Sequence, residues 1–292
     1  MTVLFYVFAV VAARSESALG KYNGMCGGSS VKFNLNKSLL AAFFCLLIGL
    51  FSGGIEFHSR TLVYALFYGL LLAVSMVAGL KALSLGSMAI TSTVVSFSLI
   101  IPTLFGVIFL DESLGVIGIF AILLLGVSIV LLNFKKSKNP ISPECWFYSI
   151  LTMLANGFCS VIQKLHQTAY PGKFNSEFMF YGMSFVFLFL VIASIVTRLG
   201  EKKTENPPKT DSLVLGMVIL LGALAGVCNG VANLLTLTLS ATENASVLFP
   251  ILSAGNAVGS CLVGCTIFKE KLTKLQIFSL ALGIASVVML KI

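Results

Sequence analysis

The chain has 292 residues, of which 58% are hydrophobic and 10% are charged, and its formal net charge is +8. Soluble domains carry about 25% charged residues, so this composition excludes a single water-soluble core and indicates a protein whose solvent is lipid. No basic face exposed to water is expected, which excludes nucleic acid as a partner. The polar stretches are too short for a fused kinase or ATPase domain.

Ten apolar stretches follow one another along the chain, each close to the roughly 20 residues that a helix needs to span a bilayer. Backbone groups in hydrocarbon must be paired within their own segment, and these runs are continuous, so helices are favoured over barrel strands. The first stretch has no basic segment before it and no clean cleavage site after it, so we expect it to be retained. The predicted helices cover residues 2–20, 38–57, 61–82, 87–110, 113–133, 146–166, 177–198, 212–239, 244–267 and 273–291.

The segment 270–290 repeats the segment 112–132, which lies 158 residues earlier. The two segments are identical at eight of 21 positions, whereas about two or three matches are expected for apolar segments of this composition. A weaker match at an offset of 143 residues places Lys21 over Lys164. The chain therefore contains an internal duplication.

The duplication predicts two repeats of five helices each. An odd number of helices makes the second repeat enter the membrane from the opposite side, an arrangement from which many secondary transporters are built. We therefore predict an all-α membrane protein with ten transmembrane helices in two inverted five-helix repeats. The repeats are residues 1–135 and 145–292, joined by the basic, proline-containing segment 133–144.

Several charged residues fall within the predicted helices, where they are costly and usually face a cavity or a partner. Arg14, Ser17 and Lys21 share one helix face by their spacing, whereas Glu16 lies about 200° around the helix from Arg14. Arg14 is a candidate for binding an anionic group, and Glu16 for binding an amine or a coupling proton. The alternative is that both lie among lipid head groups. Lys81 either faces the cavity or extends to the membrane surface.

Further candidates are a second lysine and three asparagines. Lys164, like its repeat counterpart Lys21, is either a cavity cation or an anchor at the membrane interface. Asn229 and Asn233 lie one turn apart; these two and Asn156 bond either a polar ligand or a neighbouring helix. The candidate substrate-binding residues are Arg14, Glu16, Ser17, Lys21, Lys81, Asn156, Lys164, Asn229 and Asn233.

No catalytic group, metal site or cofactor site is predicted, and an intramembrane enzyme is disfavoured. The seven cysteines have no metal-ligand spacing, and His58 and His166 lie near loops without a paired-carboxylate motif. Glu112, Glu270 and Glu243 lie at the starts of predicted helices, where a carboxylate interacts favourably with the helix dipole. We interpret these three glutamates as structural.

The distribution of basic residues between the connections predicts an orientation. Thirteen lysines and arginines, Lys37 among them, fall in the connections after the first, fifth, seventh and ninth helices, and four fall on the other side. The positive-inside rule then predicts that the first set is cytoplasmic and that both termini lie outside.

The segments 109–114 (FLDESL) and 267–272 (IFKEKL), each followed by a helix with a late glycine, resemble the EamA-type pattern of the drug/metabolite transporter superfamily. The Asn-Gly pair at Asn156, followed by Lys164, is similar to the same pattern. The resemblance implies a ten-helix bundle whose cavity is lined by helices 1, 3, 4, 6, 8 and 9, and cytoplasmic termini, opposite to the charge count. Arg14 stands where the family has glycine, so the substrate of typical members cannot be carried over.

These features predict a secondary transporter, by the resemblance an exporter, that works by alternating access on a small polar metabolite. The excess of candidate cations favours an anionic or zwitterionic substrate, such as an amino acid or an organic acid. The alternatives are an exporter of cationic drugs or amines that uses Glu16, and a non-transporting membrane scaffold or receptor. We expect a monomer or homodimer in the plasma (inner) membrane, with the small-molecule substrate and the lipid bilayer as partners.

Overall fold

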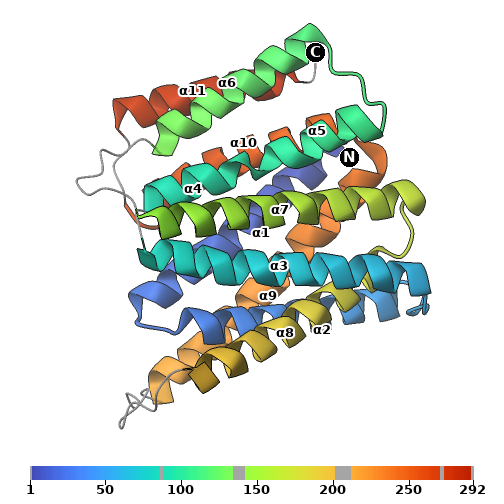
Figure 1. Ribbon diagram of the computed structural model, residues 1–292, viewed down its shortest axis with the longest axis vertical. Helices are drawn as coiled ribbons and strands as arrows, with labels where there is room; N and C mark the ends of the chain where they lie inside the picture. The colour runs from blue at the N-terminus through green and yellow to red at the C-terminus, as the bar shows by residue number, and fades with distance from the viewer. Residues whose placement is uncertain (1, 86–87, 134–141, 201–211, 270–272, 291–292) are drawn as a thin grey trace.

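The structure is a computed structural model that describes residues 2–85, 88–133, 142–200, 212–269 and 273–290. Within these residues the regular secondary structure is helical throughout, which confirms the all-α prediction. Successive helices cross the molecule in alternating directions (Figure 1). They are α1 (Thr2–Met25), α2 (Ser30–Phe51), α3 (Ser59–Leu85), α4 (Met88–Ser96), the 3-10 turn η1 (Phe97–Leu99), α5 (Ile100–Phe109), α6 (Val116–Asn133), α7 (Pro143–Ala169), α8 (Asn175–Gly200), α9 (Ser212–Thr242), α10 (Ala245–Thr266) and α11 (Lys274–Met289).

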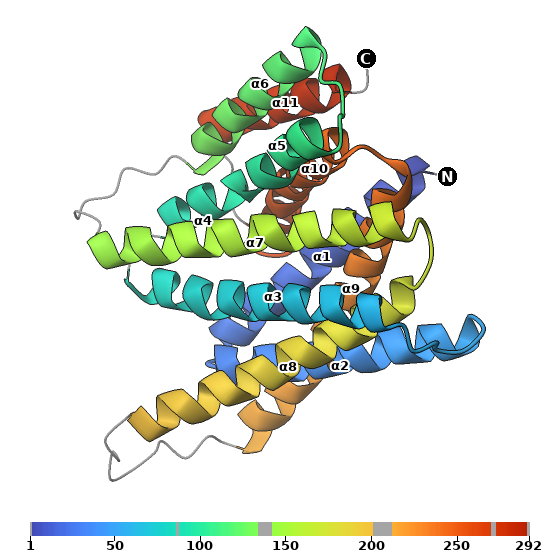
Figure 2. The ribbon, with the colours of Figure 1, turned by 45° about the vertical axis from the view of Figure 1, so that its right-hand side comes forward.

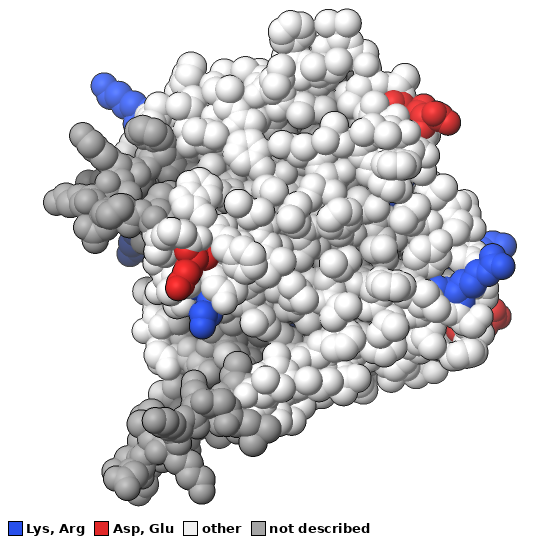
Figure 3. Space-filling view, viewed as in Figure 1, with Lys and Arg blue, Asp and Glu red and all other residues white. Residues whose placement is uncertain are grey.

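The helices match the dimensions of a lipid bilayer. Among the described residues, eight are long and apolar enough to cross a membrane, with α4 to α5 counted together, and α6 and α11 are shorter apolar helices. Large side chains such as Phe8, Phe67 and Phe120 are exposed in the middle of their helices. On the face shown in Figure 3, charged side chains lie toward the left and right sides and leave the centre uncharged. The protein is therefore an integral, multi-pass membrane protein.

The second helix begins at Ser30 rather than at residue 38 and ends at Phe51 rather than at residue 57. The side chain of Ser29 caps it by accepting a hydrogen bond from the backbone N–H of Lys32. Lys37, which was counted among the connection lysines, consequently lies inside α2 and is buried, so that assignment is wrong. A polar first turn concealed the true start of this helix.

The predicted helix 87–110 is divided into α4, η1 and α5. Pro102 has no N–H to donate to the carbonyl oxygen of Ser98, which lies within the 3-10 turn. The ladder of helix hydrogen bonds is therefore interrupted near Pro102. Pro250, by contrast, lies inside α10 without ending it.

The two halves are inverted relative to each other. In Figures 1 and 2, α1 starts near the N-terminus on the right, whereas its counterpart α7 starts on the left. The helix contacts have the same symmetry. The contact of α3 with α7 has its counterpart in that of α9 with α1, and the contact of α3 with α8 has its counterpart in that of α9 with α2. Between α6 and α11, Ser128 Oγ donates to the carbonyl oxygen of Ser279 at 2.7 Å, and Ser279 Oγ donates to that of Ser128 at 2.6 Å. The inverted five-helix architecture is as predicted, and the repeat boundaries stay a prediction.

Glycines let the helices around the centre approach closely. A Cβ atom on Gly226 of α9 would lie 2.6 Å from the backbone oxygen of Lys37 and 2.8 Å from Cβ of Leu40, both on α2. A Cβ atom on Gly69 of α3 would lie 2.6 Å from Cβ of Phe185 on α8. Because lipid tails are as apolar as the helices, association depends on such close packing. These contacts fix where the inner helices stand.

Replacing Gly226 by alanine is expected to lower stability by about 1–3 kcal/mol, because the backbone of α2 must move to admit the methyl group. The matched control is Gly216→Ala in the same helix, where an added Cβ would meet nothing within 4 Å. Alanine is favoured over glycine inside a helix, so the control should unfold at the same or a higher temperature. Thermal unfolding followed by thiol labelling of the buried Cys45 and Cys159 measures both. Equal unfolding temperatures for the two variants would contradict this packing.

Candidate functional site: a polar cavity between the two halves

A central cavity of about 750 Å³ lies among α1, α4, α7, α9 and α10. Its volume falls within the roughly 300–1,000 Å³ of small-molecule sites. The resemblance implied a contribution from the third helix, but no described residue of α3 lines the cavity, because α3 packs on α7 and α8 instead. The polar lining residues are Arg14, Glu16, Ser17, Lys21, Ser92, Ser96, Ser98, Asn156, Ser160, Gln163, Asn229, Asn233, Thr236, Ser253, Asn256 and Ser260.

The cavity extends toward the side of the molecule where α1 ends and α2 begins, on the left in Figure 1. Ser17, Lys21 and Ser260 line it and are exposed, so they mark its mouth. Lys21 Nζ there lies 3.9 Å from the centroid of the Phe268 ring. At the other end the lining reaches the buried Phe249. The cavity thus has one accessible end and one buried end.

The only carboxylate that lines the cavity among the described residues, Glu16, is paired. Lys37 Nζ donates to Glu16 Oε1 at 2.8 Å, and Asn229 Nδ2 donates to Glu16 Oε2 at 2.9 Å. Lys37 is buried and reaches Glu16 from α2, behind the cavity wall. The two opposite charges therefore form a unit with no net charge.

Arg14 has a neutral partner on the far wall. Its Nη1 donates to Ser260 Oγ at 2.7 Å, and its aliphatic stem lies where Gly259 lacks a side chain, 2.7 Å from an added Cβ. Its Nε is buried and has no hydrogen-bond partner, and neither has the buried Oδ1 of Asn256. A guanidinium bonded to a hydroxyl keeps its positive charge available to an anion that enters the cavity.

The amides on α9 contact other helices and line the cavity at the same time. Asn233 Oδ1 accepts hydrogen bonds from Tyr68 Oη at 3.2 Å and from Gln163 Nε2 at 3.5 Å. Asn233 Nδ2 donates to the carbonyl oxygen of Asn229 at 2.9 Å. The predicted alternative of contact between helices is therefore present, both asparagines also line the cavity, and binding of a polar ligand stays a prediction.

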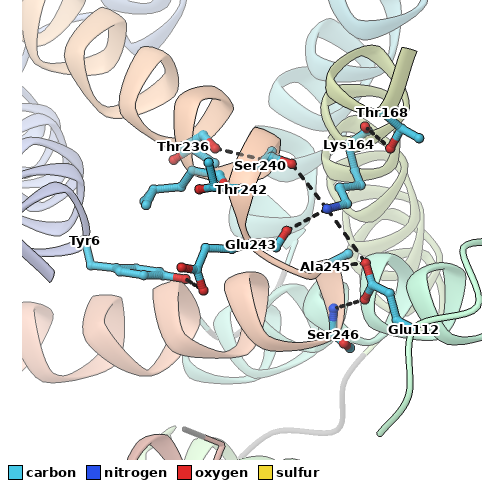
Figure 4. Close-up of polar contacts among 11 residues, drawn as sticks. Tyr6, Glu112, Lys164, Thr168, Thr236, Ser240, Thr242, Glu243, Ala245 and Ser246 are labelled. Carbon is cyan, nitrogen blue, oxygen red and sulfur yellow. Dashed lines mark hydrogen bonds and ion pairs between the residues drawn. The ribbon is translucent and has the colours of Figure 1, made fainter. Parts of the chain in front are cut away.

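Glu112 bridges the two halves through the start of α10 (Figure 4). Its carboxylate accepts hydrogen bonds from the backbone N–H groups of Ala245 and Ser246, both at 2.8 Å. It therefore interacts with the N-terminus of α10 and not with that of its own helix, which corrects the predicted partner. Asn244, at the N-cap position of α10, makes no side-chain cap bond. Glu270 lies outside the described residues.

Lys164 joins the same network from α7. Its Nζ lies 3.7 Å from Glu112 Oε1 and donates to the carbonyl oxygens of Ser240 and Glu243 at 3.2 and 2.6 Å (Figure 4). Tyr6 Oη of α1 donates to Glu243 Oε2 at 3.4 Å. Charged and backbone groups from four helices and two connections thus meet in this network.

The structure brings most of the predicted site residues together. Lys164 does not line the cavity and lies in the network at its buried end. Lys81 is exposed on α3, with its Nζ 6.0 Å from the centroid of the Tyr148 ring, and is also absent from the lining. The candidates that line the cavity are Arg14, Glu16, Ser17, Lys21, Asn156, Asn229 and Asn233.

Four residues of the site were not predicted from the sequence: Lys37, Gln163, Asn256 and Ser260. Asn256 and Ser260 lie one turn apart inside a predicted helix, the same signal that selected the pair on α9, so they could have been found. No sequence signal pointed to Lys37. Among the described residues, no group of three or more His, Cys, Asp or Glu side chains could hold a metal ion.

Comparison with known proteins agrees with this architecture. A solved structure, titled only as the crystal structure of a protein, covers 97% of this chain and 94% of its own, with a TM-score of 0.72 and 14% identity. At that identity the likeness establishes the fold alone. No curated protein matches the chain. The sequence of residues 1–134 matches the EamA-like transporter family, part of the drug/metabolite transporter superfamily. Residues 1–134 of this membrane protein are therefore similar in sequence to the EamA-like transporter family.

Proposed function

We propose that the protein is a secondary transporter that exports a small anionic or zwitterionic metabolite, such as an amino acid or an organic acid. The observation that carries the proposal is the polar cavity between the inverted halves, in which the Arg14 guanidinium bonds the neutral hydroxyl of Ser260. Export is the direction that the family resemblance implies.

The charges of the cavity wall favour an anionic group on the substrate. Glu16 is neutralised by Lys37 at 2.8 Å, whereas Arg14 contributes a positive charge and donates a hydrogen bond to the hydroxyl of Ser260. An anionic group at Arg14 would gain a charge-assisted hydrogen bond, which is stronger than one between neutral groups. The amide oxygen of Asn256 nearby suits an amine or hydroxyl on the same molecule.

The shape of the cavity supports alternating access. One end is accessible at Ser17 and Lys21, and the other ends at the network of Glu112 and Lys164. That network joins a residue of the first half to helices of the second. Rocking of the halves against each other would break it and open this end, as in transporters built from inverted repeats.

The export of amines or cationic drugs through Glu16 is the weaker alternative. A cationic substrate would have to displace Lys37 from the carboxylate, and Lys37 is buried and has no described carboxylate other than Glu16 within ion-pair distance. A scaffold without transport would need no polar cavity of this size. A flux measurement separates all three functions.

Arg14→Gln is expected to weaken substrate uptake by about tenfold or more in proteoliposomes, because it removes a charge-assisted contact. The assay is counterflow of radiolabelled amino acids and organic acids. Arg60→Gln, which removes an exposed arginine at the start of α3, is the matched control and should transport normally. Flux of amines alone, lost in Glu16→Gln and retained in Arg14→Gln, would support the alternative. No flux of any class would contradict transport.

The Glu16–Lys37 pair predicts a non-additive stability pattern. Glu16→Gln and Lys37→Met each leave one charge without its partner, and for a fully buried pair this costs about 3–5 kcal/mol. The cost should be smaller here because Glu16 borders the cavity. The double variant should be more stable than the sum of the two losses predicts. Unfolding temperatures of the four proteins measure this, and strict additivity would show that the pair is not coupled.

Glu112→Gln is expected to open the buried end of the cavity more often, because α10 loses a charged cap and Lys164 loses its counter-charge. The measurement is the rate at which an impermeant maleimide labels Ser246→Cys, resolved by peptide mass spectrometry. We expect a several-fold faster reaction than with Glu112 present. Glu144→Gln, at the exposed start of α7 on the opposite side, is the control. An unchanged rate in Glu112→Gln would show that this network is not the barrier.

A further inference from the structure

An apolar groove of about 490 Å³ runs along the outside of the protein between α1, α10 and α11. We call it the outer groove. Its lining is almost entirely apolar and includes glycines at positions 255, 259 and 283. The exposed apolar residues that define it are Val7, Val11, Leu262, Ile284 and Val288.

Arg14 lies between the outer groove and the central cavity and lines both. Its stem crosses the contact between α1 and α10, where Gly259 leaves room, and its Nη1 reaches Ser260 on the cavity side. Val263 also lines both spaces. The central cavity and the outer groove therefore adjoin at Arg14. Among the described residues that line the outer groove, Arg14 is the only charged one.

The inverted repeat supplies a comparison within the same protein. The contact between α5 and α6 in the first half, which corresponds to the contact between α10 and α11, has an apolar groove of about 340 Å³. This counterpart groove is lined by Phe97, Ile100, Leu123, Val127 and other apolar residues, and no charged residue is among its described lining. The two grooves differ in that only the outer groove adjoins a cation and a polar cavity.

We propose that the substrate is an amphiphile with an anionic head and an apolar tail. The head binds Arg14 in the central cavity, and the tail passes between α1 and α10 into the outer groove. This inference rests on the proposed function and names the substrate class of the same site. The polar cavity accommodates the anionic head. A tail that lies in the outer groove stays in contact with hydrocarbon and does not have to enter a polar space.

A photoreactive probe tests this arrangement in the full-length protein in nanodiscs. The probe is a dodecyl sulfonate with a diazirine at the far end of its chain, and a dodecanol with the same diazirine is the neutral control. Peptide mass spectrometry compares labelling of α10 and α11 at the outer groove with labelling of α6 at the counterpart groove. We expect the sulfonate to label the outer groove about tenfold more than the counterpart groove, as for one charge-assisted contact. The neutral probe should label both grooves equally.

Three variants make the result specific. Arg14→Gln should abolish the preference of the sulfonate for the outer groove. Ile284→Trp fills the outer groove from an exposed position and should reduce labelling there, whereas Leu123→Trp, its match in the counterpart groove, should leave the outer groove labelled. Equal labelling of both grooves by the sulfonate in the unaltered protein would overturn the inference.

Flux measurements distinguish failure of this inference from failure of the proposed function. Arg14-dependent counterflow of short polar acids, together with equal labelling of the two grooves, would support the transporter function and contradict the amphiphilic substrate. Absence of flux for short acids and for the sulfonate would overturn both. Sulfonate flux that is lost in Ile284→Trp and kept in Leu123→Trp would support both.

Discussion

The carboxylate of Glu112 holds the two halves of the protein together at one end. A helix that begins inside a membrane protein has N–H groups with no intrahelical partner, and lipid offers none. Glu112 accepts from two of these groups at the start of α10, and its negative charge in turn binds Lys164 of α7. The position of α10, and with it one wall of the central cavity, depends on this contact. The cavity lining reaches the exposed Ser17 and Lys21 in one direction and the buried Phe249 in the other.

The same requirement for pairing determines the charge of the cavity. Glu16 and Lys37 satisfy each other, and Glu16 also accepts from Asn229, so the pair adds little net field to the space in front of it. Arg14 donates a hydrogen bond to Ser260, and a hydroxyl carries no charge. The carboxylate in the cavity wall is thus paired with a cation, whereas Arg14 bonds a neutral group. This difference in pairing, more than the number of charged residues, favours an anionic group on the substrate.

Much of the fold could be predicted because membrane helices are apolar over their whole length, and the inverted order follows from a duplication with an odd number of helices. The failures have a common cause. Lys37 lies in a polar helical turn, and hydropathy cannot separate such a turn from a loop. Glu112 was expected to interact with its own helix, but its partner lies 133 residues further along the chain. Contacts between distant segments have no local sequence signal, so the sequence indicated which residues were unusual and not which ones meet.

Comparison of the two halves distinguishes residues that maintain the fold from residues that form the candidate site. Ser128 and Ser279 make reciprocal bonds, and the helix contacts exchange between the halves, as a symmetric fold requires. Arg14 breaks this pattern, because the equivalent groove of the first half contains no described charge. Arg14 is half-buried, and an arginine inside a membrane helix is costly in lipid. Since the counterpart groove forms without a described charge, we attribute this cost to a ligand that Arg14 binds.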